Sequence, residues 1–136
     1  YVFVGVSIRN QEEANTLIKE LRQSGLATED MSNNEMAKLH VRHLVGGHAH
    51  DVKNEILYRF EFPDRPGALM NFLNNMSHNW NISLFHYRNH GADYGRVLIG
   101  IQVPPEEKSD FKAFLNQLGY RYWEETKNPA YKLFLG

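Results

Sequence analysis

The residues with the clearest potential for binding chemistry lie at 63–69 (PDRPGAL), where an expected strand passes into an expected helix. Free N–H groups at a helix start attract carboxylates, and Gly67 would let a small ligand approach the main chain closely. The same residues also make an ordinary helix start, with Asp64 as the capping side chain and Pro66 near the first helical position. Both interpretations are open from the residues alone.

A second candidate is the segment 83–88 (SLFHYR), which is expected to be a strand. Alternation along a strand sends one set of side chains to each face, namely Leu84, His86 and Arg88 to one and Ser83, Phe85 and Tyr87 to the other. Tyr87 or Arg88 could lie close to a ligand or transmit its arrival, because a guanidinium matches a carboxylate. The alternative is a plain strand at a sheet edge or subunit interface. Arg42 invites the same choice between a ligand contact and a surface charge.

Signals for catalysis or metal binding are weak. The seven histidines show no i, i+4 pair on a helix, and His48 and His50 lie in a glycine-rich stretch, so we expect no metal site. The sequence has no cysteine, no phosphate-binding loop and no GxSxG or GxGxxG motif. We therefore expect neither catalytic residues nor a bound cofactor in this chain.

The elements that would position these residues form a β-α-β-β-α-β pattern over residues 55–136. Strands are predicted at 56–62, 81–89 and 97–103, with a turn at 90–95. A short strand and then a last strand at 130–135 are predicted near the end. The first helix begins at Pro66 and the second ends at Gly119, and their apolar residues recur at helical spacing: Leu69, Phe72, Leu73, Met76 and Trp80, then Phe111, Phe114, Leu115 and Leu118. This pattern predicts an α+β, ferredoxin-like unit with an antiparallel sheet and helices on one face.

Residues 1–45 look like a partial copy of the same unit. Residues 2–8 (VFVGVSI) resemble 97–103 (VLIGIQV), and from residue 12 onward the correspondence continues at a spacing of 94, with Gly25 matching Gly119 and Leu39 matching Leu133. The partial copy is expected to read strand, helix, strand, strand, followed by a linker at 46–54. Its first strand would need a neighbour in the second unit, in another chain or in an upstream segment.

The segment 32–41 carries conflicting signals. Residues 32–35 (SNNE) have the form of a capping box, which favours a helix start, whereas the repeat aligns 36–41 with the expected strand at 130–135. We expect a single helical turn followed by a strand.

Composition excludes several classes of partner. The formal net charge is −1, from 15 basic and 16 acidic residues with no basic block, so we expect neither nucleic acid nor a membrane surface to bind. No apolar stretch approaches the roughly 18 residues of a membrane span, and none resembles a secretory signal. These features favour a soluble, cytoplasmic protein.

Four stretches together identify a family resemblance: FEFPDRPGAL, WNISLFHYRNHGADYGRVL, MAKLHVRHLVGG and NPAYKLFLG. They resemble the carboxy-terminal region of the biosynthetic threonine deaminases, also called threonine dehydratases, over essentially the whole chain. The resemblance implies a regulatory domain of two ACT-like subdomains. It also implies a separate catalytic domain that uses pyridoxal phosphate to convert threonine to 2-oxobutanoate and ammonia. Isoleucine would be the inhibitor and valine its antagonist. The chain would self-associate, as a dimer or, in the full enzyme, as a tetramer.

The resemblance is carried to matching positions only. It implies effector contacts at a set of residues in three motifs, namely Asp64, Arg65, Pro66, Gly67, Ala68, Leu69, Leu84, Tyr87, Arg88 and Arg42. Backbone groups near Gly67 would hold the ligand's charged end, and an apolar wall including Leu69, Leu73 and Leu84 would recognise its aliphatic side chain. The lysine-bearing cofactor site and the opening β-α-β of the first subdomain are not among these residues. The alternative function is an oligomerisation module that senses nothing.

Overall fold

The computed structural model describes residues 3–41, 51–89, 91 and 93–136, and its centre is a four-stranded antiparallel sheet. The strands are β1 (Glu55–Pro63), β2 (Asn81–Asn89), β3 (Tyr94–Gln102) and β4 (Arg121–Glu124), in the spatial order β2-β3-β1-β4. β1 pairs with β3 over its whole length and with β4 at its centre. With α3 between β1 and β2 and α4 between β3 and β4, this is the predicted ferredoxin-like arrangement.

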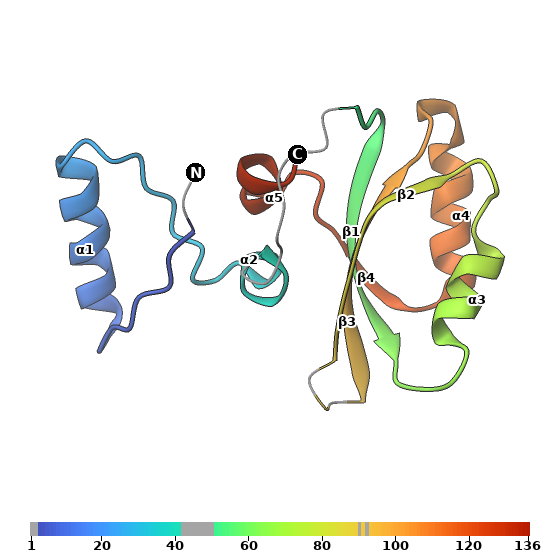
Figure 1. The fold of residues 1–136 in the computed structure, drawn as a ribbon, viewed down its shortest axis with the longest axis horizontal. Coiled ribbons are helices and arrows are strands. Elements are labelled where there is room, and N and C mark those ends of the chain that lie inside the picture. Colours follow the sequence, from blue (N-terminus) through green and yellow to red (C-terminus); the bar gives the residue numbers. More distant parts are fainter. Residues whose placement is uncertain (1–2, 42–50, 90, 92) are drawn as a thin grey trace.

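Helices α3 (Ala68–Asn75) and α4 (Lys108–Leu118) cover one face of the sheet, and a short 3-10 turn, η2 (Pro105–Glu107), leads into α4 (Figure 1). The core between these helices and the sheet is largely aromatic. Its fully buried members include Phe60, Phe62, Phe72 and Phe111. The spacing of apolar residues predicted these two helices, because a helix that covers a sheet turns one apolar face toward it.

The prediction that the first helix continues to Trp80 is wrong. α3 ends at Asn75, because Met76 has an extended backbone, with φ −74° and ψ 141°. Trp80 follows in a turn, where its ring packs edge-on against Phe111 and Phe114 and its Nε1 donates to Glu107 Oε2 at 2.6 Å. The Trp80 ring is therefore carried by the loop after α3 and is buried against α4.

Two short helices, α2 (Glu35–Leu39) and α5 (Pro129–Phe134), cover the opposite face of the sheet (Figure 1). The strands predicted at 130–135 and after the helical turn at 36–41 are therefore wrong, and helices lie on both faces. Both segments carry local helix-start signals that compete with the strand pattern. Asn34 and Asn128 cap the two helices with their side chains, and Pro129 occupies a first-turn position. The helix start predicted at 32–35 is confirmed, with Asn34 and not Ser32 as its cap.

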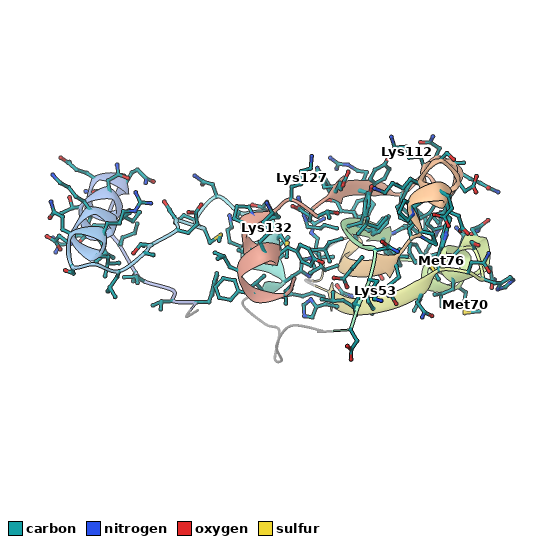
Figure 2. All side chains as sticks on the ribbon, turned by 90° about the horizontal axis from the view of Figure 1, so that it is seen from above. Lys53, Met70, Met76, Lys112, Lys127 and Lys132 are labelled. Carbon is teal, nitrogen blue, oxygen red and sulfur yellow. The ribbon has the colours of Figure 1, made fainter. Side chains whose placement is uncertain are left out.

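Residues 4–30 extend away from the sheet, whereas Phe3 and Met31 on either side pack against the apolar cluster around Met36. α1 (Gln11–Gln23) begins at the cap Asn10 and is followed by Gly25 at φ +81°, as the repeat predicted. Both views place α1 beyond α2 and α5 (Figures 1 and 2). The strand predicted at 2–8 is wrong for residues 3–8, which form no ladder and leave Val4 and Val6 67% and 58% exposed. No described strand lies beside them, and an isolated strand cannot satisfy its backbone.

The predicted linker 46–54 lies mostly outside the described residues. Its last part, 51–54, is irregular and ends at Asn54, which has a positive φ of 56° and whose carbonyl accepts a hydrogen bond from Val103 N. None of the helices in the described ranges combines the length and the apolar character needed to cross a bilayer.

Burial of Tyr58 predicts that the fold weakens in alkali. Its side chain is 7% exposed, and this burial, with the Glu124 charge nearby, raises the pKa of Tyr58 to about 12 from an ordinary 10. Above pH 10 the unfolded chain loses the phenolic proton before the folded chain does, so the free energy of unfolding falls as pH rises. We expect a loss of about 1 kcal/mol between pH 9 and pH 11, measured by urea unfolding. Tyr58→Phe should lose correspondingly less, and an unchanged pH dependence in that variant would contradict the assignment.

Candidate functional site

The turn between β1 and α3 presents an uncapped helix start. Gly67 is the N-cap residue, has φ +85° and provides no side chain to the first-turn amides. The prediction that Asp64 caps the helix is wrong, because no side chain of the described residues caps α3; the backbone N–H of Asp64 donates to Asp93 O at 2.8 Å. Pro66 lies just outside the helix and not at its first position. A left-handed backbone is strained for residues with a Cβ, so glycine is the natural residue at 67.

Tyr120, which lies between α4 and β4, holds the start of α3 in place. The buried Tyr120 donates its hydroxyl to Ala68 O at 2.9 Å and accepts a hydrogen bond from Asn71 Nδ2 at 3.2 Å. Sequence reasoning missed both residues. The available signal was a tyrosine directly after the helix-ending Gly119, because a buried tyrosine hydroxyl needs a partner.

Tyr87 reaches the same end of the sheet as this turn. It lies on the edge strand β2 opposite Val97, on the α3 side of the sheet, and is 46% exposed. Its ring crosses β3 at Gly95, where a Cβ would lie 2.5 Å from the Tyr87 hydroxyl oxygen. Gly95 pairs with Phe62, one residue before β1 ends. The structure therefore brings Tyr87 and the turn at 64–67 to the same end of the sheet.

An exposed apolar surface adjoins this turn along α3. Leu69, Met70 and Leu73 are 42%, 57% and 36% exposed, while Phe72 between them is fully buried. Figure 2 places Met70 on the periphery, at the end of the molecule away from α1. Phe85 lies on the same side of the sheet as Tyr87 and is also exposed. Exposed apolar residues grouped in this way are typical of a surface that binds a ligand or another protein surface.

Two further predicted residues, Leu84 and Arg88, lie on the other face of the sheet. Leu84 packs against the apolar cluster around Met36, and Arg88 Nη1 lies 3.5 Å from Leu39 O. The sheet therefore separates Leu84 from Leu69 and Leu73, and these three do not form one wall within this chain. Arg42 lies outside the described residues.

The predicted alternation along β2 holds for Leu84, His86 and Arg88 but is wrong for Ser83. A bulge between Ile82 and Leu84 breaks the regular register, and Ser83 Oγ bonds to the Glu55 carboxylate. The same carboxylate accepts from the Tyr131 hydroxyl of α5. Gly100 makes this possible, because a Cβ there would lie 2.6 Å from Glu55 Oε1.

Hollows and possible metal ligands give no second candidate. Two open hollows, of about 610 and 400 Å³, lie elsewhere, one along α1 and one beside Asn34 and Asn128. Within the described part of the chain, no three histidine, aspartate or glutamate side chains are grouped so as to hold a metal ion. The chemistry available at the α3 turn is therefore binding by backbone amides, one tyrosine and apolar side chains.

Comparison with known proteins gives one family and several relatives. The family described as the C-terminal regulatory domain of threonine dehydratase matches residues 46–135. Over 135 residues the chain is 50% identical to the biosynthetic L-threonine dehydratase IlvA of Burkholderia multivorans, covering 99% of this chain and 27% of that protein. It is also 50% identical to IlvA of Escherichia coli (98% and 26%) and to the mitochondrial threonine dehydratase of Saccharomyces cerevisiae (99% and 23%). The chain thus spans about a quarter of the length of these relatives.

Removing the Tyr120 hydroxyl should loosen the turn. We expect Tyr120→Phe to lower the free energy of unfolding by about 1–3 kcal/mol, because it leaves the Ala68 carbonyl and the Asn71 amide without this partner. Tyr122→Phe is the matched control, since Tyr122 is 40% exposed and its ring contacts do not involve the hydroxyl. Urea unfolding measures both, and equal stabilities of the two variants would show that Tyr120 does not hold the turn.

Proposed function

Because this chain belongs to the family of the C-terminal regulatory domain of threonine dehydratase, we propose that it senses amino acids for that enzyme and leaves catalysis to another part of the protein. The resemblance recognised in its sequence motifs is thereby confirmed. The parent enzyme would convert threonine to 2-oxobutanoate and ammonia, with pyridoxal phosphate bound in its catalytic domain. Isoleucine would be the inhibitory effector and valine the antagonist.

The observation that carries the proposal is the open turn at Gly67 beside exposed apolar residues of α3. The amides of the first turn, with Arg65 beside them, would hold the effector carboxylate, because the start of a helix favours negative charge. Leu69 and Leu73 would contact the branched side chain. The surface is open, so a facing surface would be needed to exclude water from the ligand.

Tyr87 and Arg88 would divide two tasks between the faces of β2. Tyr87, on the α3 side and at the same sheet end as the turn, would touch the effector. Arg88, on the opposite side and close to Leu39 O at the end of α2, would transmit its arrival to residues 3–41. A single edge strand would in this way connect the ligand surface to the first copy of the repeat.

Residues 3–41 would be the closing part of a first ACT-like subdomain. Two equivalences at the spacing of 94 support this: Gly25 and Gly119 follow α1 and α4 with φ +81° and +71°, and Asn34 and Asn128 cap α2 and α5. Residues 3–8, equivalent to part of β3, would become a strand beside the β-α-β that precedes them in the full subdomain. That partner would also cover Val4 and Val6.

Regulation would follow from differential binding. Isoleucine and valine differ by one methylene, which is worth only about 1–3 kcal/mol in an apolar pocket. Opposite effects must therefore come from different preferences for two arrangements of the regulatory subdomains. Coupling of this kind is typically worth about 1–3 kcal/mol.

The exposed apolar residues also fit a second function, an assembly module that binds no effector. Val4, Val6 and Ile8 of the first copy and Leu69 and Met70 of α3 would then be buried only by other subunits. A measurement of ligand binding distinguishes the sensing function from the assembly module.

Isoleucine should stabilise this chain against heat. At 100 times Kd, binding to the folded state adds about 2.7 kcal/mol, or roughly 8–10 °C for a chain of this size. Leu69→Asp should abolish the shift. Leu26→Asp, at a residue 56% exposed in the loop after α1, should retain it. Threonine and serine serve as ligand controls in the same thermal titration.

The absence of a shift is informative when the titration is repeated with the whole regulatory domain. A shift that appears only there would show that residues preceding this chain complete the pocket. No shift in either protein would reject the sensing function in favour of the assembly module.

A further inference from the structure

The two short helices on one face of the sheet begin at equivalent residues of the repeat. Asn34 Oδ1 accepts a hydrogen bond from Ala37 N at 3.0 Å, and Asn128 Oδ1 accepts one from Ala130 N at 2.9 Å. Each amide oxygen therefore caps its own helix, α2 or α5. Each asparagine also has an NH2 group that capping does not use, which serine or aspartate at a cap would lack.

These NH2 groups join the two caps to each other. Asn34 Nδ2 donates to Asn128 Oδ1 at 2.7 Å, and Asn128 Nδ2 donates to Asn34 Oδ1 at 3.2 Å. The two residues are 94 positions apart in the sequence. The pair is thus a reciprocal, pseudo-symmetric contact between the first copy of the repeat and the second. Capping alone does not require it.

The contact continues into the centre of the sheet. Asn128 Nδ2 also donates to Glu125 Oε2 at 2.6 Å, and Glu125 Oε1 accepts from Arg59 Nε of β1 at 3.0 Å. The side chains of Arg59 and Glu125 are 11% and 12% exposed, and the Arg59 guanidinium stacks 4.3 Å from the centre of the Trp123 ring. The low exposure and the stacking hold Arg59 and Glu125 in place, so the series of contacts that begins at Asn34 ends on a fixed residue of β1.

The other end of α2 is also tied to the sheet. The Nδ1 atoms of His40 and His86 lie 2.8 Å apart, and His86 belongs to β2. α2 is thus held at its start by polar contacts to the cap of α5, which Glu125 connects to β1, and at its end by a contact to the edge strand. A shift of about 1 Å at its start would break both amide bonds together, because they already span 2.7 and 3.2 Å.

We propose that the Asn34–Asn128 pair is a coupling device that makes α2 and α5 open and shift as one unit. The first repeat copy is thereby linked to the sheet through Glu125 and Arg59. The pair has two states, both bonds made or both broken, and this is the kind of element that passes a displacement on. Its use in effector response rests on the function proposed above; the coupling itself does not.

A cycle of serine variants tests whether the pair carries energy between the helices. Serine keeps a capping oxygen but is too short to reach the opposite amide. We expect Asn34→Ser and Asn128→Ser to lower the melting temperature by amounts that do not add, because either one breaks the pair. Asn10→Ser is the matched control. Asn10 caps α1 in the same way, accepting from Glu13 N at 2.9 Å, and should combine additively with Asn128→Ser.

Amide hydrogen exchange then tests the joint opening. Lys132→Gly weakens α5 at an exposed position that Figure 2 labels on that helix. It should speed exchange in α5 about fivefold and in α2 by a similar factor, since a helix-interior glycine costs a factor of this order. With Asn34→Ser also present, exchange in α2 should no longer respond to Lys132→Gly. An equal response with and without the pair would overturn the proposal and assign the coupling to the apolar contacts between the helices.

Repeating the exchange with isoleucine separates this inference from the proposed function. Protection at α3 in both proteins, but at α2 only when the pair is intact, would support the pair as the relay. Protection at α2 that survives Asn34→Ser would overturn it. If isoleucine protects no segment, the sensing function fails, and the exchange without ligand still decides whether the pair couples the helices.

Discussion

The central strand β1 is covered on both faces, and the places of the other elements follow from this constraint. Phe60 and Phe62 face the aromatic core under α3 and α4, whereas Leu57 faces Met36, Ala130 and Tyr131 on the other side. A strand buried on both faces cannot leave either set of side chains in water. The sheet therefore needs a second cover, and the short helices α2 and α5 provide it. Because α2 belongs to the first copy of the repeat, this need also joins the two copies.

The edge strand β2 lies at the border of the sheet, between the layer of α3 and α4 on one face and the layer of α2 and α5 on the other. Tyr87 faces the side of α3 and Arg88 the side of α2, so adjacent residues belong to different environments. The bulge before Leu84 and the glycines at 95 and 100 adapt the strand to them. Gly95 admits the Tyr87 ring, and Gly100 admits the Glu55 carboxylate.

The polar contacts between the copies are few but specific. A purely apolar contact between α2 and α5 would tolerate sliding, because dispersion contacts have little directional preference. The paired amides of Asn34 and Asn128 fix one register instead, and Glu125, itself paired with Arg59 within the second copy, holds Asn128 in place.

The sequence by itself determined the family, the ferredoxin-like order of elements in residues 55–136 and the repeat at a spacing of 94. These depend on the spacing of apolar residues and on helix-ending glycines such as Gly25 and Gly119, whose effect comes from the neighbouring backbone alone. It also predicted the strand-to-helix turn that precedes α3 and the strand 81–89 that carries Tyr87. Only the tertiary structure decided that residues 129–134 form a helix, that residues 3–8 lack a sheet neighbour, and that Leu84 and Leu69 lie on opposite faces. Strand and short helix compete closely in brief apolar segments, and the outcome depends on which surface is available to bury them, which the local sequence does not encode.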